Sequence, residues 1–364
     1  MLKPLRALLF ASLTVMAATG STGSRPVAYA ALDGLNAPAP RDGQLSVMTY
    51  NVQGLPWPIA WGREEALTKI GDRLATLRRA GRQPHIVLLQ EAFTPEAAGI
   101  ARRAGYAHVA TGPGTELAPS PPATATDRAY LAQARWDRGE AMGKRFGSGL
   151  MILSDYPIVG QARMAFPAFA CAGFDCLANK GVLIAHIAVP GFAAPVSIVN
   201  THLNARKAAG VPISRSQRAF TRQVALLAAF VGAQVPRGHS LVLGGDMNIG
   251  GDPARNVAFF RHWAHSDYIF VKPALGGVRR ALNLPYQIDR DALAASAARA
   301  KDWLFARDEQ GRPMVVTQAS VPFGQEADGA PLSDHYGYAL TYAPTGRPEE
   351  PDVRLAALAV EDQP

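Results

Sequence analysis

The sequence predicts an α/β domain in which helices pack against sheets of buried strands. Short apolar runs recur along the chain and end in polar residues or glycine, which is typical of strands buried in a sheet. Amphipathic helical segments lie between them, and 48% hydrophobic with 18% charged residues is ordinary for a globular protein. The predicted strands are residues 45–50, 85–90, 149–154, 180–189, 196–201, 240–245, 302–306 and 336–342.

Two segments between these strands have the period of amphipathic helices. The first places apolar side chains on one face and arginines on the other. Its apolar face consists of Leu67, Ile70, Leu74 and Leu77, and its basic face of Arg73, Arg78 and Arg79. The second begins with a capping-box pattern, Ser214 followed three residues later by Gln217. Its apolar face consists of Phe220, Val224, Leu227 and Val231.

The N-terminus has the pattern of a secretory signal peptide. Lys3 and Arg6 precede an apolar run at 7–18, and Ala28 and Ala30 form a small-x-small cleavage site. The run is short for a bilayer span, so a retained membrane anchor is the less favoured alternative. We expect cleavage after Ala30 and export to the periplasm or the medium.

Local composition predicts the boundaries of the remaining segments of the chain. Residues 111–140 are rich in Pro, Ala and Thr without a clear period, which predicts a long loop or insertion. We expect four segments: a signal peptide at 1–30, a linker at 31–44, one layered domain at 45–343 and a loose tail at 344–364.

The net charge indicates which kinds of partner to expect, and the two cysteines indicate a disulfide. Loss of the signal peptide removes Lys3, Arg6 and Arg25 and no acid, so the formal charge falls from +8 to +5. A basic exported protein suits anionic partners such as nucleic acid, phosphate esters or a membrane surface, although such a charge also serves solubility. Cys171 and Cys176 lie close together, and in an exported chain we expect a disulfide rather than a zinc site.

Polar side chains collect where the predicted strands end. Carboxylate and amide oxygens are the ligands that Mg²⁺ requires, and histidines supply a general base near neutral pH. No G-x-S-x-G nucleophile motif is present, so the set favours metal-assisted attack of water on phosphorus. Each residue alone has a structural alternative: a turn, a helix start or a satisfied core histidine. The set is Asn51, Gln90, Glu91, Asn200, His202, Asn204, Asp246, Asn248, Asp334 and His335.

The order of these motifs resembles the endonuclease/exonuclease/phosphatase superfamily. The matching segments are "YNVQG", "LLQEAF", "GLMILSDYPI", "NTHLNA", "GGDMN" and "SDHY", from about residue 45 to 340. The resemblance implies a four-layer α/β sandwich of the deoxyribonuclease I type. Two mostly antiparallel sheets would face each other, helices would lie outside, and the active site would be at one edge.

The resemblance also implies roles for the strand-end residues. Glu91 would be the main Mg²⁺ ligand, with Asn51 beside it and Asp334 near the metal. Asp246 and Asn248 would position the phosphate and the attacking water, and His202 would stabilise charge on the phosphoryl oxygens. His335 would be the general base, oriented by Asp302; the structural alternative for Asp302 is a surface acid that opens a strand. We expect Mg²⁺ as the cofactor, with Mn²⁺ or Co²⁺ able to substitute.

Within the superfamily, the chain is similar to the secreted and neutral sphingomyelinases. "NVQGLPWP" and "SDHYGY" resemble their motifs, and Asp175 and Lys180 match an acid–lysine pair of that branch. The resemblance implies that this pair completes the active site, where a lysine offers a point charge to the phosphate. The alternative is a chance salt bridge in a disulfide-bounded loop. The branch predicts hydrolysis of sphingomyelin to ceramide and phosphocholine.

Trp57 and Trp61 follow Asn51 in an apolar loop and would form a rim suited to a membrane interface. The alternative is a buried hydrophobic staple. The segment before the final motif carries only Phe323, whereas secreted bacterial sphingomyelinases place an aromatic-tipped hairpin there. We therefore expect a phospholipid substrate at a membrane surface, and neither nucleic acid nor a stable protein partner.

Three other hypotheses remain open at this stage. A secreted nuclease would suit the positive charge, but it should carry polar and basic site loops, and the loop after Asn51 is apolar until Arg63. An inactive binding module on the same fold should have lost some of the catalytic residues. His262 and His265 could form a helical zinc pair, although no third ligand accompanies them.

Overall fold

The computed structural model describes residues 27–28, 44–57, 59–264, 268–285, 289–324, 326 and 330–344. Most of the predicted signal peptide and linker, and the tail beyond 344, lie outside the described residues. Within them, no helix combines the length and apolar composition needed to cross a bilayer.

Two sheets face each other at the centre of the molecule. The first has seven strands in the order β1-β4-β5-β3-β2-β12-β11, and the second has five in the order β10-β9-β8-β7-β6. The first consists of β1 Val27–Ala28, β2 Leu45–Gly54, β3 Ile86–Ala92, β4 His108–Thr111, β5 Met151–Ser154, β11 Val315–Phe323 and β12 Gly337–Ala343. The second consists of β6 Ile158–Ala165, β7 Gly181–Ile187, β8 Val196–His202, β9 Leu241–Asp246 and β10 Asp302–Arg307.

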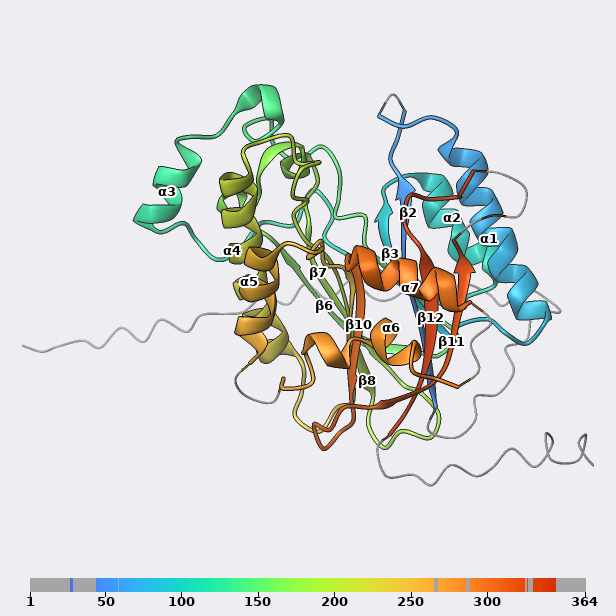
Figure 1. The fold of residues 1–364 in the computed structure, drawn as a ribbon. Helices are drawn as coiled ribbons and strands as arrows, with labels where there is room; N and C mark the ends of the chain where they lie inside the picture. Colours follow the sequence, from blue (N-terminus) through green and yellow to red (C-terminus); the bar gives the residue numbers. More distant parts are fainter. Residues whose placement is uncertain are drawn as a thin grey trace, which may run out of the picture.

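Helices cover the outer faces of both sheets. In Figure 1, α1 and α2 lie on the side of the first sheet, and α4 and α5 on the side of the second. The short helix α6 contacts β10 and β11, one edge strand of each sheet, and closes one open side of the sandwich. The α-helices are α1 Arg63–Arg79, α2 Pro95–Ala104, α3 Ala125–Leu131, α4 Ile213–Gln234, α5 Pro253–Trp263, α6 Gly277–Ala281 and α7 Arg290–Arg299. The 3₁₀ helices are η1 Trp136–Arg138, η2 Ala168–Ala170, η3 Gly173–Leu177 and η4 Pro273–Leu275.

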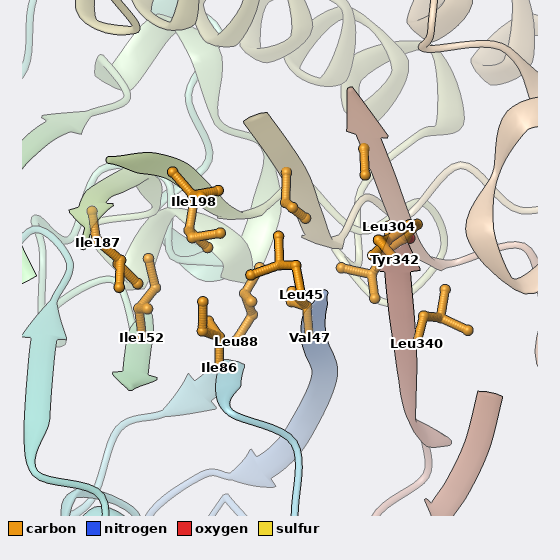
Figure 2. Close-up of a cluster of buried hydrophobic side chains, with 14 of the residues drawn as sticks. Leu45, Val47, Ile86, Leu88, Ile152, Ile187, Ile198, Leu304, Leu340 and Tyr342 are labelled. Atoms are coloured by element: carbon orange, nitrogen blue, oxygen red, sulfur yellow. The ribbon is translucent and has the colours of Figure 1, made fainter. Parts of the chain in front are cut away.

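The apolar runs are continuous because both faces of the central strands are buried. On β2, Val47 points into the core between the sheets, whereas Met48 points into the core beneath α1 and α2. Figure 2 shows the core between the sheets, where Leu88 and Ile152 of the first sheet face Ile198 and other residues of the second. The predicted four-layer α/β sandwich is confirmed.

All eight predicted strands and both predicted helices are present, with differences at their ends. The capping-box prediction is wrong: α4 begins at Ile213, its N-cap is Pro212, and no side chain caps it. Glu91 ends β3 and does not begin a helix, because Thr94 caps α2 instead. The insertion at 111–140 is mainly loop but contains α3, which a capping box between Thr124 and Asp127 stabilises.

A buried ion pair ties α1 to the loop after β5. Arg78 Nη2 lies 2.6 Å from Asp155 Oδ1, and the two side chains are only 1% and 2% exposed. His85 Nδ1 lies 2.9 Å from the other oxygen of Asp155. Because water does not reach these buried groups, each charge is compensated only by its protein partner, and loss of one partner would leave the other charge buried and uncompensated.

Asp155→Ala would leave the Arg78 guanidinium buried without its counter-charge, and we expect the free energy of unfolding to fall by about 3–5 kcal/mol. Urea denaturation measures this change. The matched control is Asp72→Ala, because Asp72 pairs with Arg103 at the surface, where both side chains are about half exposed. The control should lose no more than about 1 kcal/mol, and equal losses in the two variants would contradict the account.

Candidate active site

The candidate active site lies where two parallel strand pairs end. Most neighbouring strands are antiparallel, but β2 pairs parallel with β3, and β8 pairs parallel with β9. The first pair carries Asn51 and Glu91 near its end, where Asn51 aligns with Gln90, and the second aligns His202 with Asp246. Asp302 begins the antiparallel strand β10 directly opposite Asp246. The topology therefore brings Asn51 and Asp246, which are 195 positions apart, to one edge of the sandwich.

Asn51 connects the carboxylates of the two sheets. Its Nδ2 donates to Glu91 Oε1 at 2.9 Å and to Asp246 Oδ2 at 3.2 Å. Its Oδ1 accepts from the backbone N–H of Gln53 at 3.0 Å. In this arrangement Asn51 orients the predicted metal ligand, and direct coordination by Asn51 would require its amide to turn over.

A second amide pair lies beneath this contact and joins the same two sheets. Gln90 Nε2 donates to Asn200 Oδ1 at 2.8 Å. Asn200 Nδ2 donates to the carbonyl oxygens of Leu89 and Met151, each at 2.9 Å. Gln90 and Asn200 are fully buried, so these bonds hold the strand ends beneath Glu91 in register.

His335 and Asp302 form a buried acid–base pair. His335 Nδ1 lies 2.8 and 3.0 Å from the two oxygens of Asp302, and its Nε2 lies 3.7 Å from Asp246 Oδ2. Burial lowers the pKa of His335, but the charges of Asp302 and Asp246 and the hydrogen bond with Asp302 outweigh burial and raise it to about 9. The alternative of a surface acid is wrong for Asp302, which is buried.

Lys180 joins Asp175 to His202. Its Nζ lies 2.7 Å from Asp175 Oδ1 and 3.1 Å from His202 Nε2. Because an ammonium can only donate, Nε2 accepts and the ring proton is on Nδ1, which has no hydrogen-bond partner among the described residues. Burial, followed by the positive charges of Lys180, His335 and Lys301, holds the pKa of His202 well below its usual value. His202 is therefore a neutral hydrogen-bonding group near pH 7.

A predicted disulfide supports the loop that carries Asp175. Cys171 and Cys176 are bonded, which confirms the pairing. Glu140, at the end of the insertion, accepts from the backbone N–H of Gly173 at 2.9 Å and from Arg215 Nε at 2.6 Å. The disulfide and this buried carboxylate hold η3 in place, so Asp175 is fixed on two sides.

The turn after β9 positions Asn248. Its backbone N–H donates to Asp246 Oδ1 at 3.0 Å, and its Nδ2 donates to Leu203 O at 3.0 Å. Asn248 adopts a left-handed conformation, φ 48°, which asparagine tolerates better than most residues. The buried Arg255 donates to the carbonyl oxygens of Asn204 and Asn248, each at 2.7 Å. Sequence reasoning missed Arg255, because an arginine on a helix ordinarily predicts an exposed face.

Many of these groups line a cavity of about 590 Å³. Its lining combines polar side chains, here called the polar wall, with apolar ones, here called the apolar wall, and this combination suits a molecule with a charged head and an apolar body. The polar wall consists of Glu91, Asp175, Lys180, His202, Asp246, Asn248, Lys301, Asp334 and His335. The apolar wall includes Leu55, Ile59, Phe93, Phe146, Phe174 and Leu177. The sequence analysis missed Lys301 and the phenylalanines, because they lie far apart in the sequence and line one cavity only after folding.

Trp57 and Trp61 stand beside the apolar wall and point into solvent. They are 70% and 77% exposed, and their rings meet edge to face with centroids 6.1 Å apart. The alternative of a buried staple is therefore wrong. Ile59, between them in the sequence, lines the cavity, so the loop that carries the pair reaches the cavity. Phe323 is fully buried and stacks on Tyr50 at 4.7 Å, so it contributes nothing to an exposed surface.

The carboxylates at the polar wall fit a hard divalent cation. The pKa of Glu91 and the pKa of Asp246 are both raised, mainly by burial. The negative charge of a neighbouring acid raises each of them further. A bound cation would relieve both effects. Asp334 is exposed and lines the same cavity.

A different trio has ligand atoms within 4.8 Å of one another: Asp246, Asp302 and His335. Both oxygens of Asp302 already lie within hydrogen-bond distance of His335 Nδ1, which favours an orienting role for Asp302 over ligation. The helical zinc pair is not supported within the described part of the chain, since His262 is exposed on α5 and His265 lies outside that part.

Comparisons with known proteins agree with this geometry. A family profile described as "Endonuclease/Exonuclease/phosphatase family" matches residues 48–335. Among curated protein sequences, none matches the chain. The fold is similar to that of sphingomyelinase C from Streptomyces griseocarneus, with 20% identity, a TM-score of 0.53, and coverage of 82% of this chain and 99% of that one.

The beta toxin of Staphylococcus aureus is similar as well. Its structure matches with 18% identity, a TM-score of 0.54, and coverage of 82% of this chain and 99% of the toxin. A variant of the same toxin, with the same identity, coverage and TM-score, has bound magnesium ions. At these identities, the likeness shows a shared fold.

The pKa of His335 should depend on Asp302. In the metal-free protein we expect the imidazole to lose its proton at a pH of about 9, because nearby carboxylates stabilise the protonated ring. Asp302→Asn removes the carboxylate whose charge raises this pKa most, so the pKa of His335 should fall. NMR titration of the ring measures it. Asp334→Asn is the control and should lower the pKa less, and an unchanged pKa in Asp302→Asn would refute the pairing.

Proposed function

The chain belongs to the endonuclease/exonuclease/phosphatase family, and we propose that it is an exported, Mg²⁺-dependent phosphodiesterase that hydrolyses sphingomyelin to ceramide and phosphocholine. The observation that carries the proposal is the cavity, whose lining combines acid–base groups with apolar side chains and includes Ile59 from the loop that exposes two tryptophans. A phosphodiester in a bilayer has this combination of a charged reacting group and a large apolar body.

The residues of the polar wall divide the chemistry among them. His335 Nε2 faces the cavity and takes a proton from the attacking water, while Asp302 holds Nδ1 and stabilises the imidazolium that forms. The water oxygen bonds to phosphorus, the bond from phosphorus to the ceramide oxygen breaks, and the departing alkoxide takes up a proton from solvent to give ceramide. His202, Asn248 and Asp246 surround the reacting phosphate and hold it and the water in line.

Glu91 and Asp246 would hold the metal ion, with Asn51 between them and Asp334 nearby. A divalent cation supplies charge neutralisation and Lewis acidity at the phosphoryl oxygens. Charge neutralisation at Asp246 also removes one cause of the raised pKa of His335, which brings the imidazole closer to the range of a general base. Mg²⁺ fits this oxygen-rich set, and Mn²⁺ or Co²⁺ would substitute.

Three features support action at a membrane surface. Trp57 and Trp61 expose large amphipathic rings next to the cavity. The predicted mature chain carries a formal charge of +5, which suits an anionic bilayer surface. The signal-peptide pattern of residues 1–30 supports export, in which the protein meets lipid from outside the cell.

Parallel release assays test this function. With Mg²⁺ present, we expect phosphocholine from sphingomyelin vesicles, less from phosphatidylcholine vesicles, and intact plasmid DNA. Excess chelator should stop the reaction and added Mg²⁺ should restore it, because the two buried carboxylates need the cation. Plasmid nicking at a rate that rivals lipid hydrolysis would move the protein to the nucleases of the family. Full activity in chelator would exclude the metal mechanism.

The tryptophans should matter only when the substrate is in a bilayer. We expect Trp57→Ala to lower the rate on sphingomyelin vesicles by about tenfold, which corresponds to ~1.4 kcal/mol of lost interfacial binding. The rate on a soluble phosphodiester should not change. Val257→Ala removes an exposed apolar side chain from α5 and serves as the control. Equal losses on vesicles and on the soluble substrate would show that Trp57 acts within the cavity.

A further inference from the structure

Two lysines line the polar wall of the cavity, and they differ in how far their ammonium groups are already engaged. Lys180 belongs to the acid–lysine pair singled out in the sequence. Lys301 precedes Asp302 and belongs to no motif. A phosphodiester carries a negative charge, so at least one of these cations must be free to meet it.

Lys180 has no free donor. Its ammonium lies 2.7 Å from Asp175 Oδ1, 3.1 Å from His202 Nε2 and 3.4 Å from Leu203 O, and an ammonium has three N–H groups. Its side chain is 5% exposed and that of Asp175 is 15% exposed. To bind a phosphate oxygen, Lys180 would have to give up a contact in a nearly dry environment, which is costly for the partner left behind.

Lys301 differs from Lys180 because its ammonium donors are not engaged by other described residues. Its ammonium makes no hydrogen bond or ion pair with any described residue, yet its side chain lines the cavity beside Asp246 and His335. Its positive charge acts on this part of the site, because it contributes to lowering the pKa of both Asp246 and His202. Lys301 is therefore a cation at the reacting centre with its donors available.

The backbone around Lys301 is held firmly. The carbonyl oxygen of Lys301 accepts from Met247 N at 2.8 Å, in the turn that carries Asp246 and Asn248. The carbonyl oxygen of Ala300 accepts from Gly250 N at 2.9 Å and from Trp303 Nε1 at 2.8 Å. Ala300 itself adopts a left-handed conformation, φ 50°, at the end of α7. The start of the lysine side chain is thus fixed next to the predicted phosphate-positioning residues.

The charges of the polar wall call for such a cation. Asp302 is balanced by His335, and Asp175 is balanced by Lys180. Glu91, Asp246 and the exposed Asp334 remain, and a divalent cation would neutralise two of these three charges without leaving an excess for the substrate. Lys301 supplies the additional positive charge that an anionic phosphodiester needs.

We propose that Lys301, rather than Lys180, binds a non-bridging oxygen of the substrate phosphate, and that Lys180 is a positioning residue that holds His202 and Asp175 in place. The inference rests on the proposed phosphodiester chemistry. It changes the role expected for Lys180 from direct contact with the phosphate to support of a neighbouring group.

Calorimetric titration with inorganic phosphate in the presence of Mg²⁺ tests the proposal without catalysis. Lys301→Gln should weaken phosphate binding about 10- to 100-fold, the scale of one hydrogen bond to a charged group. Lys301→Arg should recover most of the affinity. Lys180→Gln should change it by less than about threefold. Lys272→Gln, at an exposed lysine outside the cavity, is the matched control and should leave it unchanged.

Kinetics on a soluble phosphodiester separate the two lysines further. Lys301→Gln should raise KM, whereas Lys180→Gln should lower kcat at nearly constant KM. A phosphate affinity in Lys301→Gln equal to that of the Lys272 control, or a larger loss in Lys180→Gln, would overturn the inference. Undetectable phosphate binding by the wild-type protein would also overturn it. Failure to cleave sphingomyelin, with phosphate binding still dependent on Lys301, would reject the proposed substrate and leave the inference standing.

Discussion

The bridging hydrogen bonds of Asn51 are the contact on which the site depends. Glu91 ends a strand of the first sheet and Asp246 ends a strand of the second, and one amide group donates to both. Two carboxylates would otherwise repel each other across this edge. Because Gln90 and Asn200 fix the strands just below, the distance between the carboxylates follows from the packing of the two sheets. Any change in how the sheets pack would therefore change the distance between the carboxylates of Glu91 and Asp246.

The site also concentrates electrostatic and conformational strain that the rest of the fold supports. Burial raises the pKa of Glu91 and of Asp246, and Glu91 and Asn248 both adopt left-handed conformations, with φ of 56° and 48°. Each such conformation costs about 1–3 kcal/mol and persists only where the surrounding structure enforces it. The continuous core between the sheets supplies that enforcement, since both faces of β2 and β3 are buried. A cation would relieve the electrostatic part of the strain on binding.

The strands and the predicted site residues were accessible from sequence because each lies in a local pattern. Apolar runs predict buried strands, and polar residues at their ends predict a shared edge once the strands are parallel. The same reasoning failed where tertiary contacts determine the start of a helix or the residues of the site. Ser214 fits a capping pattern, but the helix begins at Ile213 with Pro212 as its N-cap. Lys301 and Arg255 have no local signal, and the phenylalanines of the cavity meet only after distant loops fold together. Engagement of the Lys180 donors is likewise a property of the packed structure, so its role could not be read from spacing alone.

The measurement that tests the central claim most directly is the anomalous scattering of Mn²⁺ in crystals of the protein. The account predicts an ion in the cavity within coordination distance of the Glu91 and Asp246 carboxylates, with the contact between His335 Nδ1 and Asp302 intact. An ion bound instead by Asp302 and His335 would contradict it. That result would mean that the imidazole serves as a ligand and not as the base.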